Sequence, residues 1–335
     1  MKAIKIFIYP IVKINHNLTG NSYIDDLTQA LEQNDFLIIN KSDDSRHGVL
    51  SIFKYFIKTH FFYFNWIENL HEKKFGFLQT FIFIFQLLLI KIFNKKIIWT
   101  VHNLNSHYSK SIFYKLIQKL MLKYSNIIII HTKETIAFLK TNNVKKSNIF
   151  YFFHPFKFKH KLIKSTEKKN DILIWGAMNA YKGIFEFLEF HKINKLNFTV
   201  YIAGRFSEEH YLQKVRRVSS SKVTILNSFI SDDDLIKLHE NSLFVLFPYN
   251  SKSVLNSGSL NFSLVQGSKI IGPNTGAFKE LGDLKIINIY KNYFDIIKIL
   301  NNSTELNNDD INKFIFNNSW DNFGFELKKK IKGLK

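Results

Sequence analysis

The chain has 335 residues, 46% of them hydrophobic, and a formal net charge of +20. This length predicts two domains of roughly 150 residues, each large enough to bury its own core. The absence of cysteine excludes a disulfide framework, a thiolate metal site and a cysteine nucleophile.

The positive charge is concentrated in the first half of the chain. Residues 1–165 carry 24 Lys and Arg against 9 Asp and Glu, whereas the remainder carries 23 against 18. A basic half predicts an anionic partner. Lysines interspersed with phenylalanines favour an anionic membrane surface. The alternatives are a basic face that is merely solvated and a surface that binds nucleic acid. Because the sequence contains no nucleic-acid recognition motif, we expect no nucleic-acid partner.

The first half alternates predicted strands and helices, as a doubly wound α/β domain does. Residues 1–10 alternate lysine with isoleucine and phenylalanine, which predicts a first strand and no signal peptide. The predicted strands are 2–9, 36–40, 61–66, 96–101, 126–130 and 149–153, and the predicted helices are 23–34, 49–57 and 114–124.

Residues 75–90 contain no charged side chain. The run is shorter than the about 20 residues that a membrane span needs, and Gln79, Thr80 and Gln86 interrupt it. We therefore predict a core helix, with an interfacial helix and a membrane span as alternatives.

Aromatic and polar residues stand where the predicted strands of the first half end. Ligands of open parallel sheets bind outside the carboxyl ends of the strands, so His102 at such an end is expected to face a ligand rather than to be buried. Imidazole exchanges a proton near neutral pH, which matches His102 to a hydroxyl nucleophile. The alternative is a histidine satisfied by a neighbouring backbone group. The strand-end residues are Trp66, His102 with Asn103 and His107 beyond it, His131 and His154.

The charged residues 157–170 lack periodicity and predict the linker between two domains. The second half then restarts the alternation. Its predicted strands are 171–175, 198–203, 223–226, 243–247 and 269–273, its predicted helices are 184–191, 210–218 and 235–240, and 309–332 is a terminal helical region.

The segment 243–276 has the clearest site pattern. An apolar run ends at Pro248 and Tyr249, and Ser257 is the expected N-cap of a helix that begins at Gly258. The first amides of such a helix have no intrahelical acceptor and lie at the positive end of its dipole, which favours a phosphate. The alternative is a β-α-β unit that only packs a core.

Two cations in the second half strengthen this interpretation. Lys182 and Arg205 each follow a predicted strand and stand at a turn, so both are expected at the same edge of the sheet. A diphosphate carries more charge than one helix end neutralises, and two cations would complete the neutralisation. The alternative is that both are solvated surface charges.

Together these stretches resemble the GT-B glycosyltransferases of the group-1 type, which include bacterial exopolysaccharide and lipid-linked glycan transferases. The resemblance implies an α/β fold with two Rossmann-like domains facing across a cleft. Residues 1–160 would bind the acceptor, 171–310 would bind the nucleotide-sugar, and a helix at about 312–335 would pack back on the first domain. The motifs are Trp-Thr-Val-His-Asn-Leu at 99–104, Tyr-Lys-Gly at 181–183, Ile-Ala-Gly-Arg at 202–205, Phe-Pro-Tyr at 247–249 and Ser-Gly-Ser-Leu at 257–260.

The resemblance also implies roles for individual residues. The implied catalytic residues are His102, Lys182 and Arg205. The implied donor site consists of Gly176, Lys182, Arg205, Phe229, Ile230, Tyr249, Ser257, Gly258 and Ser259. The acceptor side consists of His16, Tyr23, Trp66, Asn103 and His107. In an inverting reaction His102 is the preferred base and Glu68 the second choice, whereas in a retaining reaction the leaving phosphate takes the proton.

The implied activity is transfer of a sugar from a nucleotide-diphosphate sugar to a lipid-linked or growing polysaccharide acceptor. Cations and amides stabilise a departing diphosphate without a metal, so we expect no metal and no cofactor. We expect a cytoplasmic protein, peripheral on the inner face of the plasma membrane. Many relatives carry two glutamates about where Val254 and Phe262 stand, and an arginine where Ala177 stands. The alternative is therefore a catalytically inactive GT-B-shaped binding or scaffold protein in a polysaccharide assembly complex.

Overall fold

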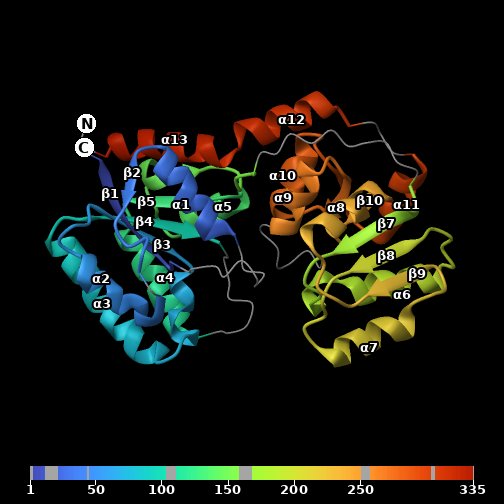
Figure 1. Ribbon diagram of the computed structural model, residues 1–335, viewed down its shortest axis with the longest axis horizontal. Coiled ribbons are helices and arrows are strands. Elements are labelled where there is room, and N and C mark those ends of the chain that lie inside the picture. Colours follow the sequence, from blue (N-terminus) through green and yellow to red (C-terminus); the bar gives the residue numbers. More distant parts are fainter. Residues whose placement is uncertain are drawn as a thin grey trace. The chain divides into compact units, whose positions relative to one another are not determined.

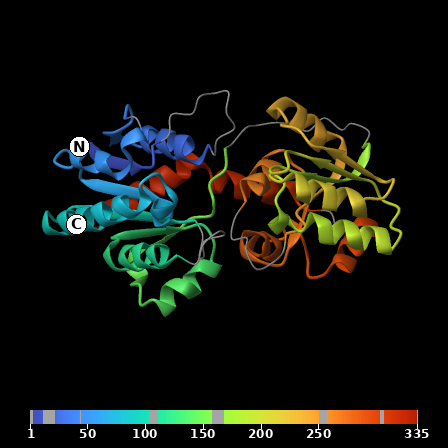
Figure 2. The ribbon, with the colours of Figure 1, turned by 90° about the horizontal axis from the view of Figure 1, so that it is seen from below.

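The computed structural model describes residues 3–11, 22–43, 45–102, 111–157, 168–249, 257–302 and 306–334. The chain divides into two compact units, Met1–Lys157 with Asn318–Lys335, and Phe158–Asn317. Each unit contains a six-stranded parallel sheet with helices packed on it (Figures 1 and 2). The predicted α/β class with two Rossmann-like domains is confirmed. The opposition of the two domains across a cleft stays a prediction.

The sheet of the first unit has the strand order β2-β1-β3-β4-β5-β6. Its side chains alternate between two apolar layers, because successive residues of a strand point to opposite faces. Ile127 and Ile129 lie in one layer, whereas Ile128 and Ile130 lie in the other. The strands are β1 (Ile4–Tyr9), β2 (Phe36–Ile38), β3 (Phe61–Asn65), β4 (Lys96–Val101), β5 (Ile127–Ile130) and β6 (Ile149–Tyr151).

Helices cover both faces of this sheet. Figure 1 shows α1 and α13 on one face and α2, α3 and α4 on the other. The helices are α1 (Tyr23–Gln33), α2 (Ser51–Tyr55), α3 (Gly76–Ile92), α4 (Ile112–Tyr124), α5 (Glu134–Thr141) and α13 (Trp320–Lys332), with short 3-10 turns η1 (Ser45–Leu50), η2 (Ile67–Glu72) and η3 (Lys146–Asn148).

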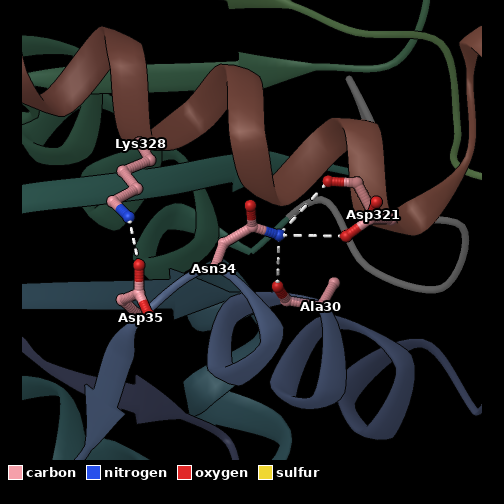
Figure 3. A network of polar contacts seen from close by, with 5 residues as sticks. All are labelled: Ala30, Asn34, Asp35, Asp321 and Lys328. Atoms are coloured by element: carbon pink, nitrogen blue, oxygen red, sulfur yellow. Dashed lines mark hydrogen bonds and ion pairs between the residues drawn. The ribbon is translucent and has the colours of Figure 1, made fainter.

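The C-terminal helix α13 packs directly on α1 (Figure 3). A Cβ atom at Gly324 would lie 2.6 Å from the carbonyl oxygen of Ala30, so only glycine permits this approach. The amide of Asn34 donates to the Ala30 carbonyl at 2.9 Å and lies 3.3 Å from the Asp321 carbonyl. Lys328 donates to Asp35 at 2.6 Å, an exposed pair that contributes little compared with the buried contact.

The sheet of the second unit has the strand order β12-β11-β10-β7-β8-β9. Its strands are β7 (Asn170–Trp175), β8 (Val200–Ala203), β9 (Val223–Leu226), β10 (Ser242–Leu246), β11 (Lys269–Pro273) and β12 (Asn288–Tyr290). Its helices are η4 (Ala180–Lys182), α6 (Ile184–Ile193), α7 (Glu209–Val218), α8 (Asp232–Glu240), α9 (Gly258–Val265), α10 (Gly276–Asp283), α11 (Tyr293–Asn301) and α12 (Asn308–Asn317).

The prediction of a core helix at 75–90 is only half correct. One face of α3 is buried, but Phe77, Phe81 and Phe85 on its other face are 60%, 52% and 54% exposed. The lack of charge in this run suggests a helix that is buried on all sides. That inference fails here because sequence composition does not say how many faces of a helix are covered by other elements. In the described part of the chain, no helix is long and apolar enough to cross a membrane.

Candidate functional site

The strand order of the second unit reverses between β7 and β10, which are paired in parallel. A crevice forms outside the carboxyl ends of the strands at such a point, because the connections on either side leave in opposite directions. The residues at this place are those that follow Trp175 in β7 and Leu246 in β10, together with the start of α9. They include most of the residues predicted to bind the donor.

Gly176 directly follows β7 and has a φ of 102°, which glycine adopts readily and other residues adopt rarely. A Cβ atom at this position would lie 3.0 Å from Nζ of Lys182 and 3.0 Å from Oγ of Ser259. These two side chains therefore approach the same point from η4 and from α9. The structure thus brings three predicted donor residues together.

Lys182 is a buried cation, with 3% of its surface exposed. Its Nζ donates to the carbonyl oxygen of Trp175 at 3.0 Å and lies 5.7 Å from the ring centroid of Tyr249. No carboxylate of the described residues forms an ion pair with it. Burial lowers the pKa of Lys182 from 10.5 to about 8, so it still carries its charge at neutral pH. A buried charge without a counter-ion is costly, and a bound anion would offset that cost.

The first turn of α9 is open to a ligand. Ser257 has the extended conformation of an N-cap, as predicted, but its side chain makes no capping bond and lies 3.2 Å from the Tyr249 hydroxyl. The amides of Leu260 and Asn261 bond to the carbonyl of Ser257. A Cβ atom at Gly258 would meet no atom within 4 Å, so the space beside this helix start is unfilled by the described residues.

Arg205 lies in the turn that follows β8, and this turn is next to the one that follows β7. A Cβ atom at Gly204 would collide with the carbonyl oxygen of Gly176, so the two turns pack backbone against backbone. Arg205 and Phe229 line a hollow of about 390 Å³, and Lys182 does not. Ile230 is half-buried and does not line it either. The hollow is completed by Phe206, Glu209, Asn227 and Ser228.

The helix α9 (Gly258–Val265) contains no glutamate, so the glutamate pair expected from the resemblance has no counterpart there. The ring of Phe262 packs edge-on against Trp175, with centroids 5.2 Å apart, and lies 5.5 Å from His239. Phe262 therefore makes aromatic packing contacts and offers no carboxylate to a ligand. Val254 lies outside the described residues, and Ala177 is exposed.

The first unit carries a cluster of aromatic rings and histidines at the carboxyl ends of its strands. Tyr23, at the start of α1, is its centre and is 3% exposed. Its ring makes edge contacts with five others at centroid distances of 4.7 to 5.8 Å. The five rings are those of Trp66, His102, His131, His154 and Trp320.

His131 fixes the hydroxyl of Tyr23. Its Nδ1 lies 2.8 Å from the carbonyl oxygen of Phe152, which only accepts, so Nδ1 carries the proton. Its Nε2 then accepts from the Tyr23 hydroxyl at 2.9 Å. Burial, followed by the nearby His154, lowers the pKa of His131 to about 3, so it is neutral. The sequence shows the strand-end positions of His131 and His154, whereas nothing local in the sequence indicates that Trp320 joins them.

Among the described residues, the side chains of Trp66 and Asn65 hold His102. Its ring stacks on Trp66 with centroids 4.1 Å and planes 17° apart, and its Nε2 lies 3.2 Å from Oδ1 of Asn65. The Nε2 proton is donated to that oxygen, which leaves Nδ1 as the basic nitrogen. Burial, with smaller contributions from His131 and His154, holds the pKa of His102 well below 6.5. It is therefore neutral at pH 7, and the lowered pKa makes it a weaker base than a free imidazole.

Glu68 does not suit the role of second-choice base. It is 1% exposed, and its Oε2 accepts from the indole N–H of Trp99 at 3.3 Å. Burial raises its pKa to about 7. The carboxyl is therefore part of the core and is closed to an acceptor.

Three predicted acceptor-side residues, His16, Asn103 and His107, lie outside the described residues. Among the residues that the structure does describe, no group of three His, Asp or Glu side chains is arranged to hold a metal ion. The predicted residues thus form two groups, one in each unit: Gly176, Lys182, Tyr249, Ser257 and Ser259 with Arg205 and Phe229 beside them, and Tyr23, Trp66 and His102.

Comparison with solved structures identifies the fold. Alr3699/HepE from Anabaena in complex with UDP shares 8% sequence identity over 99% of this chain and 100% of its own, with a TM-score of 0.67. The lipopolysaccharide outer core galactosyltransferase WaaB, in its apo form, shares 12% over 98% and 99%, also at 0.67. A glycosyltransferase from Rickettsia africae shares 13% over 100% and 99%, at 0.64. The chain has the GT-B fold.

The resemblance stated from the sequence motifs is therefore confirmed at the level of the GT-B fold. No family model and no curated protein sequence matches the chain. Identities this low establish the GT-B fold alone. The reaction must be argued from the residues of the two groups.

Proposed function

We propose that the protein is a glycosyltransferase that moves a sugar from a nucleoside-diphosphate sugar to an acceptor hydroxyl. The observation that carries this proposal is the convergence of Lys182 and Ser259 on Gly176 beside the open start of α9. A buried ammonium, a hydroxyl and unfilled amide donors at one strand end suit a diphosphate. HepE structures containing UDP and UDP-glucose support this donor class.

Arg205 and Phe229 extend the proposed donor site. A guanidinium beside an exposed ring provides a charge for a phosphate and a flat apolar surface for a base. Arg205, which lines the hollow, directly follows Gly204, whose backbone packs against that of Gly176. In this proposal the diphosphate binds at Lys182, and the nucleoside reaches toward Phe229.

The chemical step requires stabilisation of the departing diphosphate and removal of a proton from the acceptor. Lys182 and the first amides of α9 supply the stabilisation because their charge is fixed before the reaction. His102 is the proton acceptor if the reaction inverts, since it is neutral and its Nδ1 has no bond among the described residues. If the reaction retains, His102 orients the acceptor. Neither route calls for a metal or cofactor.

We further propose a lipid-linked or growing polysaccharide acceptor, bound by the first unit. The Trp66 ring, partly exposed and stacked on His102, offers an apolar face of the kind that packs on sugar rings. The basic first half suits peripheral association with the inner face of the plasma membrane from the cytoplasm.

An inactive binding protein of the same fold is the second candidate. It is favoured by Phe262, which fills a position where a carboxylate would grip the donor, with an aromatic contact to Trp175. Such a protein would keep the fold without binding any nucleotide-sugar.

The test is a donor screen by calorimetric titration and mass spectrometry with the full-length protein. We expect heat and turnover with at least one nucleotide-sugar. Lys182→Ala should abolish both and keep the circular dichroism of the folded protein. Lys214→Ala, an exposed lysine on α7, is the matched control and should behave as wild type. Absence of heat with every donor would favour the binding protein, and an unchanged Lys182→Ala would refute the proposed site.

A further inference from the structure

Helix α3 has a stripe of apolar side chains that is exposed to solvent. The stripe runs through Phe77, Phe81, Phe85, Leu88 and Ile92, whose spacing of four, four, three and four residues keeps it on one face. Their exposed fractions range from 49% to 75%. Apolar side chains in such a row normally point into a core. Seventeen residues of helix make the stripe about 25 Å long.

Neighbouring elements extend the stripe at both ends. At one end, Phe113 of α4 contacts Phe77 edge-on at 5.2 Å. At the other end, Phe56 contacts Phe93 edge-on at 5.5 Å. Contiguous apolar patches of this extent mark interaction sites on folded proteins. We call the exposed residues of this region the α3 surface: Ile57, Phe77, Leu78, Phe81, Phe85, Leu88, Ile92, Phe93 and Ile112.

The flanks of the α3 surface are cationic. Residues 51–124 contain eleven lysines, no arginine and two glutamates, and one of the glutamates is buried. Ammonium groups lie over aromatic rings of this region: Lys74 is 5.4 Å from the ring centroid of Phe75, and Lys95 is 5.2 Å from that of Phe56. The exposed lysines are Lys54, Lys58, Lys73, Lys74, Lys91, Lys115, Lys119 and Lys123.

We propose that the α3 surface docks on an anionic lipid bilayer, with α3 lying in the plane of the interface. Hydrocarbon would receive the Phe and Leu side chains to a depth of about 5–10 Å, and the lysines would meet the acidic headgroups. The inference specifies the face used in the membrane association proposed above, and it is independent of the chemistry of sugar transfer.

The charges decide between a bilayer and a second copy of the chain. A dimer through this face would bring two lysine rims together, and like charges in a desolvated interface are costly. An acidic bilayer instead supplies opposite charge at the rim and hydrocarbon at the centre. Nucleic acid would satisfy the lysines but would leave the nine apolar side chains of the α3 surface in water.

The experiment is co-sedimentation of the full-length protein with vesicles of phosphatidylcholine containing about one third phosphatidylglycerol. We expect binding that weakens with added salt and with removal of phosphatidylglycerol. The double variant Phe81→Ser with Phe85→Ser should lose at least tenfold in vesicle affinity. Its control, Phe294→Ser with Phe316→Ser, changes two comparably exposed phenylalanines of the second unit and should bind like wild type.

A second variant distinguishes a loss of membrane binding from a folding defect of the Phe81/Phe85 variant. Lys115→Glu with Lys119→Glu changes two exposed lysines of α4 and should also weaken binding to the anionic vesicles. Equal binding by the Phe81/Phe85 variant and wild type, or no binding by wild type, would overturn the proposal. Lipid-free dimers in sedimentation velocity that vanish in the Phe81/Phe85 variant would assign the surface to a second copy instead. Nucleotide-sugar titration of each variant keeps the result separate from the fate of the proposed reaction.

Discussion

The ammonium nitrogen of Lys182 lies 3.0 Å from the carbonyl oxygen of Trp175, at the carboxyl end of β7. That carbonyl dipole compensates only part of a buried positive charge, and the lowered pKa of about 8 is the consequence. Burial therefore weakens the ammonium form of Lys182 without neutralising it at pH 7, and a bound anion would stabilise that form.

The first prediction is a pH dependence of diphosphate binding. Below pH 8 Lys182 is already protonated, so the affinity is constant. Above pH 8 the empty protein must take up a proton to bind, so the affinity falls by about tenfold for each pH unit. Titration calorimetry with UDP at pH 7 and pH 9, in two buffers of different ionisation enthalpy, measures both the affinity and the proton uptake. Equal affinities at the two pH values would contradict the assignment.

The second prediction concerns Gly176→Ala. The new methyl group would meet Lys182 Nζ and Ser259 Oγ at 3.0 Å, and the φ of 102° would be strained. We expect at least a tenfold loss of UDP affinity and a destabilisation of about 1–3 kcal/mol. Gly333→Ala is the control, because its methyl group would meet ordinary contacts at 3.5 Å. Chemical denaturation and calorimetry separate the two effects, and unchanged UDP affinity would remove Gly176 from the site.

The positions of the proposed donor residues could be predicted from sequence because each follows a short apolar strand or opens a helix. Gly176, Lys182 and Ser259 meet at one point because parallel strands end at the same edge, and strand ends are visible in a sequence. The sequence does not show that Arg205 and Phe229 line a hollow that Lys182 does not line. This arrangement depends on how two glycine turns pack against each other.

The histidine cluster of the first unit was only partly predictable. His102 was found at its strand end, but Trp320 reaches Tyr23 from α13, nearly 300 residues along the chain. Such a contact is set by tertiary packing and leaves no local pattern. The exposure of α3 was missed for the same reason, since an uncharged run looks alike whether one face or all faces are covered.

The third prediction separates catalysis from positioning. His102→Asn should lower kcat by about 10²–10⁴ and leave UDP affinity unchanged, because the diphosphate contacts lie in the other unit. Tyr23→Phe removes only the hydroxyl that donates to His131, so kcat should fall by less than tenfold. Steady-state kinetics with the donor found in the screen, together with UDP titration, measures both. A His102→Asn variant with wild-type kcat would exclude the proposed base.

The fourth prediction concerns Glu68, whose buried carboxyl couples stability to pH. Its pKa is about 7 in the folded protein and near 4.5 in the unfolded chain, so the folded state binds more protons between those values. Its contribution to stability is fully present below pH 4.5 and is lost as pH rises toward 7. Glu68→Gln keeps an oxygen for the Trp99 N–H without the charge. The variant should therefore be more stable than wild type at pH 8, on the order of 1–3 kcal/mol, and equal to it near pH 4.5.

Urea denaturation at pH 8 and at pH 4.5 measures this difference. Glu72→Gln is the matched control, because that carboxyl is 38% exposed beside His71 and its loss should change the free energy of unfolding by less than about 0.5 kcal/mol. A Glu68→Gln variant that is less stable than wild type at pH 8 would mean that the carboxylate is compensated in the folded state. In that case the pKa of Glu68 would not be raised, and burial could not be the dominant influence on this carboxyl group.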